Sequence, residues 1–171
     1  MSKEEQKYFL QQGGIFACWK PYCVATVLGS GVAVCLCDPV AKVGGVSHFT
    51  VPKVNDKREE KRKYMTHSGE YSLPHLMTMM GEMGATKQNM EAHIVGGSFS
   101  PEHCNKNIGR KNIEIAKKYL KRQGVSIVNE DTSGNLGRKV LFNTANGEII
   151  VYKLRNIREC DWNADKSTNN R

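Results

Sequence analysis

Long apolar runs are absent from this chain of 171 residues, and no segment approaches the ~20 consecutive apolar residues that a membrane-spanning helix needs. The opening segment, Met1-Ser2-Lys3-Glu4-Glu5-Gln6-Lys7, is charged and lacks the apolar stretch of a secretory signal. We therefore expect a cytoplasmic protein that does not insert into a membrane.

The six cysteines lack the repeated close spacing of metal ligands. An even number of cysteines would suit a disulfide framework in a short secreted chain, but without a secretory signal we expect free thiols. His103-Cys104, with His93 ten residues earlier, is too sparse to predict a zinc site. No GxGxxG or P-loop pattern is complete either. We therefore expect no metal and no cofactor.

Acidic side chains are the scarcer charge, since 25 Lys and Arg outnumber 17 Asp and Glu and give a net charge of +8. The basic excess lies in residues 53–63, in residues 117–122 and around Arg155 and Arg158. Aromatic residues are not interleaved with these runs, which therefore resemble solvated surfaces more than a nucleic-acid-binding stripe. A nucleic-acid-binding module is a distant third interpretation, and we expect no nucleic-acid partner.

Short apolar segments with clear punctuation make up much of the chain. Their composition and spacing predict strands near residues 23–27, 32–37, 46–51, 90–95, 125–128, 139–142 and 148–154. The run at 32–37 is apolar almost throughout, which is typical of a strand buried on both faces. Asn146-Gly147 lies between the last two strands and is a strong hairpin signal.

Helical spacing occurs in two segments. From Ser72 to Gly84, apolar residues recur at three- and four-residue intervals, and Pro74 suits the first turn of a helix there. A second helix is predicted over about 109–123, with Asn107 as its cap and Gly124 as its stop.

These elements show no regular βαβ repetition and therefore predict an α+β fold. We expect a layered sandwich of mainly antiparallel strands with two principal helices. Length and 39% hydrophobic content fit a single domain over residues 1–171, with a core at about 20–154 and a polar tail at about 155–171. The charged, aperiodic segment 54–68 is predicted to be an exposed loop.

Two glycine turns frame the residues of greatest chemical interest. Gly29-Ser30-Gly31, here named the glycine turn, leads into the strand at 32–37, and Gly44-Gly45 leads into a strand that carries His48. Such an arrangement can hold a nucleophile beside its base. Taken without a wider pattern, His48 is better interpreted as a hydrogen-bonded structural histidine.

A wider pattern is present, because several blocks occur in a characteristic order. They are Leu28-Gly29-Ser30-Gly31-Val32-Ala33-Val34, Asp38-Pro39-Val40-Ala41-Lys42-Val43-Gly44-Gly45 with His48 and Pro52, Met83-Gly84-Ala85, Ile94-Val95-Gly96-Gly97, Asn107-Ile108-Gly109-Arg110-Lys111-Asn112 and Glu130-Asp131-Thr132-Ser133-Gly134-Asn135-Leu136-Gly137-Arg138. Over about residues 20–154, this series resembles the chemoreceptor glutamine deamidases called CheD.

The resemblance implies a CheD-like fold and hydrolysis of glutamine side chains on methyl-accepting chemoreceptors to glutamate and ammonia. It also implies a CheC-type phosphatase as a second partner. In the family, a cysteine after Leu-Gly-Ser attacks the amide, a histidine acts as its base and a threonine assists. His48 matches the base and Thr26 is the candidate threonine, whereas the position of the cysteine is occupied by Gly31.

Two hypotheses follow from this departure. Either the chain is a working deamidase with another nucleophile, for which Cys23, Cys35 and Ser30 are the candidates in that order, or it is an inactive CheD-like adaptor that binds chemoreceptors or a CheC-type phosphatase. The absence of any replacement nucleophile is preferred to each of these three candidates. Cys35, for instance, lies about 13 Å from Gly31 along an extended strand.

Overall fold

The computed structural model describes residues 6–54, 64–103 and 105–162. The strands in these ranges are β1 (Gln6–Phe9), β2 (Ile15–Cys18), β3 (Tyr22–Leu28), β4 (Val32–Asp38), β5 (Val43–Phe49), β6 (Glu91–Gly96), β7 (Ser126–Thr132), β8 (Gly137–Asn143) and β9 (Ile149–Leu154). The helices are α2 (Gly69–Glu82) and α3 (Ile108–Gln123), with short 3-10 helices η1 (Met65–His67) and η2 (Glu159–Trp162).

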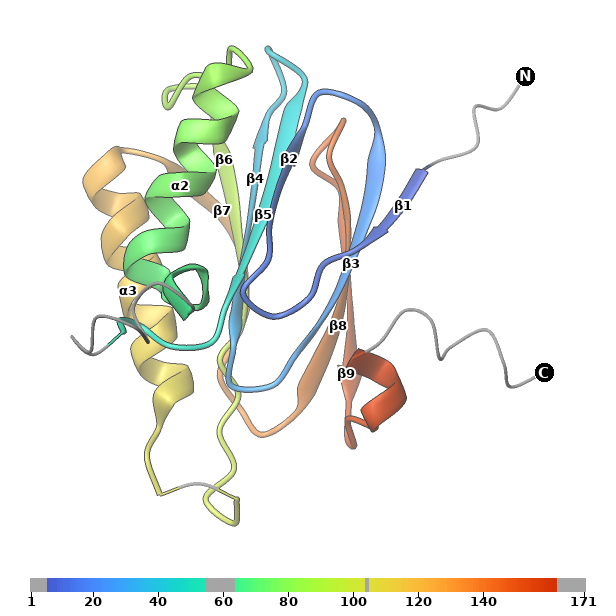
Figure 1. Cartoon of the computed structure of the whole chain (residues 1–171), viewed down its shortest axis with the longest axis vertical. Coiled ribbons are helices and arrows are strands. Elements are labelled where there is room, and N and C mark those ends of the chain that lie inside the picture. Colours follow the sequence, from blue (N-terminus) through green and yellow to red (C-terminus); the bar gives the residue numbers. More distant parts are fainter. Residues whose placement is uncertain (1–5, 55–63, 104, 163–171) are drawn as a thin grey trace.

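The elements form three layers (Figure 1). One sheet has the strand order β2-β5-β4-β6-β7 and lies in the middle, with α2 and α3 on one face and a second sheet, β1-β3-β8-β9, on the other. Only the pairs β1–β3 and β6–β7 are parallel among the strand pairs described. The predicted α+β sandwich of mainly antiparallel strands with two principal helices is therefore confirmed.

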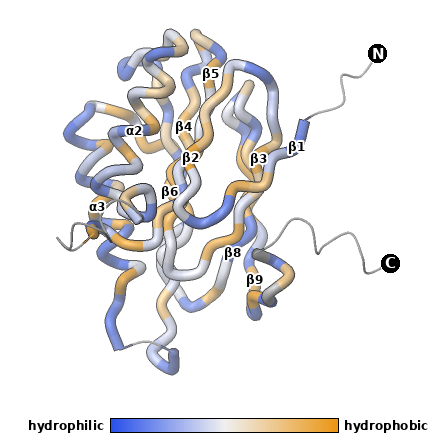
Figure 2. The backbone as a smooth tube through the Cα atoms, viewed as in Figure 1, coloured by the Kyte–Doolittle hydropathy of each residue, from blue (hydrophilic) through white to orange (hydrophobic). Residues whose placement is uncertain are grey.

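Strand β4 is buried on both faces, as its apolar sequence predicts. Val32, Val34 and Leu36 face the helices, where they join a core cluster with residues of α2 and α3. Ala33 and Cys35 face the second sheet and join the other core cluster. Figure 2 shows the hydropathy of each residue along the backbone, with β4 in the middle of the molecule. Because side chains alternate along a strand, one apolar run serves two interfaces.

The sequence predicts both ends of helix α3 correctly. The side chain of Asn107 accepts a hydrogen bond from the backbone N–H of Arg110 at 2.9 Å, and Gly124 ends the helix in the left-handed conformation with φ 71°. Both features are local, so sequence alone predicts them.

The predicted start of α2 is wrong, since the helix begins at Gly69 and Pro74 lies in its second turn. The first helical N–H groups have partners outside the helix: Gly69 donates to the carbonyl of Val51 at 2.9 Å and Glu70 donates to that of Pro52 at 3.0 Å. These contacts satisfy groups that a helix normally leaves unpaired, and they extend the helix toward its N-terminus.

The strands β1 and β2 are not predicted from the sequence, which accounts for only seven of the nine strands described. Both are four-residue edge strands, and β1 pairs in parallel with β3 while β2 pairs antiparallel with β5. The sheets therefore extend beyond the expected core of 20–154 on its N-terminal side. Most of the predicted loop at 54–68 and the end of the predicted tail, at residues 55–63 and 163–171, lie outside the described residues.

Gly44 and Gly45 of β5 allow the layers to approach closely. A Cβ atom on Gly44 would overlap the backbone of Thr144, which directly follows β8 of the second sheet, and one on Gly45 would come within 2.7 Å of Leu76 in α2. The two glycines point to opposite faces of the same strand. Their absent side chains therefore bring both the second sheet and a helix against β5, which carries His48.

We expect Gly44→Ala to lower the free energy of unfolding by at least about 2 kcal/mol, because the new methyl group must push the sheets apart. The matched control is Gly81→Ala in α2, where a Cβ has no neighbour within 4 Å. That change should be neutral or stabilising by up to about 1 kcal/mol. Urea unfolding measures both values, and equal stability of the two variants would contradict the close approach.

Candidate active site

A hydrogen bond between Thr26 and His48 connects the two sheets at one end of the sandwich. Thr26 comes from β3 and His48 from β5, and the Thr26 Oγ1 atom lies 2.8 Å from His48 Nδ1. Thr26 also donates its hydroxyl hydrogen to the backbone carbonyl of Leu10 at 2.7 Å. Since a hydroxyl has only one hydrogen, His48 Nδ1 must carry the proton of the shared bond, and Nε2 keeps a free lone pair.

His48 is held in its neutral form. Its side chain is buried, with 1% of the residue exposed. Burial, together with a smaller effect of the neighbouring His67, lowers the pKa of His48 to about 3. At neutral pH the imidazole is therefore uncharged, which is the state of a histidine that accepts a proton.

The free Nε2 atom faces Gly31 at the end of the glycine turn. A Cβ atom built on Gly31 would lie 2.9 Å from His48 Nε2 and 3.1 Å from the carbonyl oxygen of Phe49. Gly31 does not have a left-handed φ, so its backbone suits a residue with a side chain, but a Cβ atom there requires both the imidazole of His48 and the carbonyl of Phe49 to shift. The structure thus brings Thr26, His48 and Gly31 together, while their catalytic roles stay a prediction.

Three separate donors hold the glycine turn in place. The carbonyl of Gly29 accepts from the backbone of Ser98 at 3.0 Å, and that of Gly31 accepts from the backbone of Gly97 at 2.8 Å. The carbonyl of Ser30 accepts from Asn112 Nδ2 at 3.0 Å. The backbone of the turn is therefore positioned without any contribution from a side chain at residue 31.

Asn112 is a site residue that reasoning from the sequence missed. It is fully buried on α3, and its amide also donates to the carbonyl of Thr50 at 2.9 Å, just beyond β5. Its place in the helix was the available signal, because Asn112 shares the apolar face with Ile113 and Ala116. A polar residue on a buried helical face requires hydrogen-bond partners, and here they are the two segments that frame the site.

A tight turn at residues 11–14, here named the glutamine turn, lies over His48. It is closed by a hydrogen bond from the Gly14 N–H to the Gln11 carbonyl at 2.9 Å. Gly13 donates to the His48 carbonyl at 2.8 Å, and the His48 N–H donates to the Gly14 carbonyl at 3.0 Å. Gly13 has φ 75° and lies against the ring of His67, so only glycine fits there.

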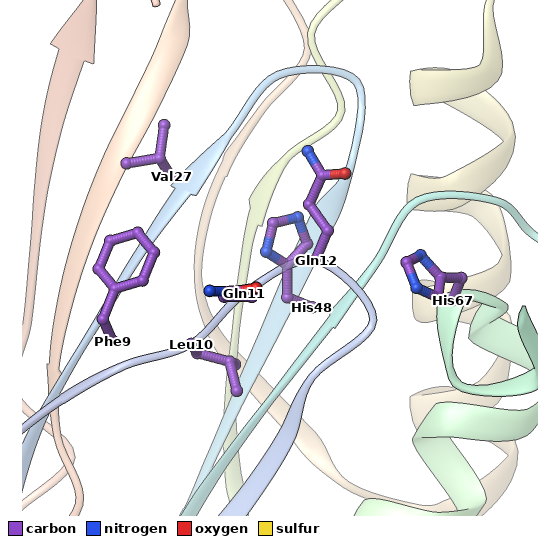
Figure 3. Close-up of a pocket in the computed structure, with 7 residues that line it drawn as sticks. All are labelled: Phe9, Leu10, Gln11, Gln12, Val27, His48 and His67. Carbon is purple, nitrogen blue, oxygen red and sulfur yellow. The ribbon is translucent and has the colours of Figure 1, made fainter. Parts of the chain in front are cut away.

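A pocket of about 500 Å³ opens beside His48 (Figure 3). The glutamine turn and His67 form part of its wall. Its lining residues are Phe9, Leu10, Gln11, Gln12, Val27, His48 and His67. Strand β1 stops pairing with β3 at Ala25, and the chain then crosses to the other sheet. The pocket therefore lies where the edge of β3 is no longer covered by β1.

The three candidate replacement nucleophiles are less suitably placed than residue 31 for a reaction beside His48 Nε2. Cys23 lies an odd number of residues from Thr26 along β3, so its side chain projects from the opposite face of the sheet. Cys35 is fully buried beside Val46 in the register of β4 and β5, and burial raises the pKa of its thiol. Ser30 is exposed and precedes the buried Gly31.

Other features of the described residues bear on cofactors and membranes. Residues 6–54, 64–103 and 105–162 contain no group of three or more His, Cys, Asp or Glu side chains arranged to hold a metal ion. Among the helices described, none combines the length and the apolar character that crossing a membrane requires.

The fold and the site together define a layered α+β protein with a buried, hydrogen-bonded Thr–His pair and a glycine that faces the free imidazole nitrogen. A family model described as CheD chemotactic sensory transduction matches residues 50–153. The chain belongs to the CheD family.

Curated relatives match over most of the chain. The chemoreceptor glutamine deamidase CheD of Thermotoga maritima is 39% identical over 127 residues, covering 74% of this chain and 78% of the relative. A probable chemoreceptor glutamine deamidase CheD of Methanococcus maripaludis is 35% identical and covers 84% and 93%, respectively. A probable chemoreceptor glutamine deamidase CheD of Anaeromyxobacter dehalogenans is 32% identical and covers 85% and 84%.

The depressed pKa of His48 predicts a loss of stability in acid. Between pH 6.5 and about 3, the unfolded chain binds a proton at His48 that the folded chain excludes, so the free energy of unfolding decreases as the pH falls through this range. Between pH 7 and 4.5 this contribution is roughly 2 to 3 kcal/mol. Urea unfolding at both pH values should show that His48→Gln loses this part of the pH dependence.

The control is His103→Gln, at an exposed position away from the pair. Its unfolding free energy should change with pH as that of the unmodified chain does. The same pH dependence in the unmodified chain and in His48→Gln would contradict a buried neutral imidazole.

Proposed function

We propose that this chain acts in chemotactic adaptation as a single cytoplasmic CheD-like domain that binds methyl-accepting chemoreceptors. Membership of the CheD family supports the pathway, and the names of its relatives support the receptor as partner. The Thr26–His48 pair marks the surface where a receptor glutamine would bind.

The chemistry of the proposed family activity places strict demands on such a site. A primary amide is a poor electrophile, so its hydrolysis through a covalent intermediate needs a nucleophile, a base and hydrogen-bond donors for the oxyanion. Thr26 and the Leu10 carbonyl set the tautomer of His48 that a base needs. The attacking atom is the missing component, because Gly31 has no side chain facing His48 Nε2.

The absence of a side chain at Gly31 is the single observation that supports binding without turnover. Removal of the nucleophile from a comparable covalent hydrolase lowers turnover on the order of a millionfold. The positions of Cys23, Cys35 and Ser30 offer no equivalent attack on an amide held beside His48. We therefore propose an inactive receptor-binding protein whose site differs from that of a deamidase by one side chain.

Gly31→Cys should create glutamine deamidation. The new sulfur would start next to His48 Nε2, which accepts the thiol proton and later returns it to the departing ammonia. Mass spectrometry of a receptor cytoplasmic fragment would detect each glutamine that becomes glutamate. We expect conversion by the Gly31→Cys variant and none by the unmodified chain under the same conditions.

Two matched variants define the mechanism. Gly31→Ala introduces the Cβ without a sulfur and should stay inactive, and Gly31→Cys combined with His48→Gln should lose most of the conversion because the thiol then has no base. Conversion by the unmodified chain that His48→Gln abolishes would instead favour the working deamidase. Absence of conversion by Gly31→Cys, in a variant that folds, would contradict the proposed site.

Receptor binding should not depend on the missing sulfur. We expect the unmodified chain and Gly31→Ala to bind a receptor cytoplasmic fragment at physiological salt with Kd values within a few-fold of each other, measured by calorimetry. A CheC-type phosphatase is proposed as a second partner on the strength of the family resemblance, and the same measurement applies to it. If the chain bound neither the receptor fragment nor the phosphatase, the adaptor role would be contradicted.

A further inference from the structure

The pocket beside His48 is lined by glutamine side chains, and the relatives are named as glutamine deamidases. Gln11 and Gln12 both line it, and both belong to the glutamine turn (Figure 3). Their side chains are exposed, and neither carboxamide makes a side-chain hydrogen bond to another described residue. Two residues with primary amides, whose donors and acceptors are unused, therefore line the pocket.

The glutamine turn is attached to the Thr26–His48 pair itself. Leu10, immediately before the turn, accepts the Thr26 hydroxyl hydrogen, and the backbone of Gly13 and Gly14 brackets His48 through two hydrogen bonds. The left-handed Gly13 confines the turn against His67. The backbone is thus fixed on the site, while the two glutamine side chains keep the freedom to turn into the pocket.

We propose that the glutamine turn is an internal ligand of the site, which places the carboxamide of Gln11 or Gln12 where a receptor glutamine binds. This inference rests on the proposed function, because it takes the pocket beside His48 as the amide-binding pocket. Being tethered, the internal amide has a high effective concentration and competes with the receptor. If it occupies the site about nine-tenths of the time, the apparent Kd for the receptor is about tenfold weaker.

Because the glutamine turn lies beside His48, its own glutamines become substrates for deamidation once a nucleophile is introduced at residue 31. In Gly31→Cys, the thiolate attacks the side-chain carbonyl carbon, a thioester forms, and the carbon–nitrogen bond breaks as ammonia leaves with a proton from His48. Water then hydrolyses the thioester, which releases the thiol and leaves glutamate at position 11 or 12. The net reaction consumes one water and releases one ammonia, and no oxidant or reductant is required.

Binding tests the competition in the chain as it exists. The double variant Gln11→Ala with Gln12→Ala removes both amides and keeps the glycines that attach the turn. Calorimetry with a receptor cytoplasmic fragment should give a Kd several-fold to about tenfold tighter than that of the unmodified chain. Gln6→Ala, at an exposed position on β1 outside the pocket, is the matched control and should leave the Kd unchanged. An unchanged or weaker affinity of the double variant would overturn the inference.

Mass spectrometry of Gly31→Cys itself tests the modification. We expect Gln11 or Gln12 to become glutamate at a rate independent of protein concentration, since the reaction is intramolecular, and we expect His48→Gln in the same background to prevent it. Gln6 and Gln123 serve as internal controls in the same digest. Conversion of receptor glutamines with Gln11 and Gln12 intact would overturn the inference and leave the proposed function standing. If no glutamine is converted anywhere, the proposed site fails, and the calorimetric comparison alone decides whether the turn competes.

Discussion

The hydrogen bond from His48 Nδ1 to Thr26 Oγ1 is the interaction on which the site depends. It crosses from one sheet to the other, so it forms only when the two sheets approach closely, and Gly44 permits that approach. The carbonyl of Leu10 takes the hydroxyl hydrogen of Thr26 and thereby sets the tautomer of His48. A contact in the N-terminal segment thus leaves the imidazole nitrogen that faces Gly31 without a proton.

The glycine turn is held in place by bonds to its backbone. Backbone groups of Gly97 and Ser98 and the amide of Asn112 bind the three carbonyls of the turn. None of these bonds involves a side chain at residue 31, so the position of the turn does not depend on the side chain that residue carries.

Local signals predicted much of the fold. The apolar run of β4, the Asn107 cap of α3 and the Asn146-Gly147 hairpin each depend on a few neighbouring residues, and the structure confirms them. The start of α2 was not predictable in this way, because Val51 and Pro52 supply the acceptors for its first N–H groups. The strands β1 and β2 are short and lie at sheet edges, where pairing partners distant in sequence define them.

The sequence by itself determined the family, because the ordered blocks that lead to CheD are a property of residue order. It also predicted the meeting of Gly31 and His48, since the resemblance expects the nucleophile and its base at these two positions. Only the tertiary structure decided the state of His48 and the surroundings of its pocket. Contacts between segments far apart in the chain place the proton on His48 Nδ1 and join Asn112 to the glycine turn. They also bring the two glutamines to the pocket beside His48. Hydrogen-bond direction and burial exist only once those segments are packed together.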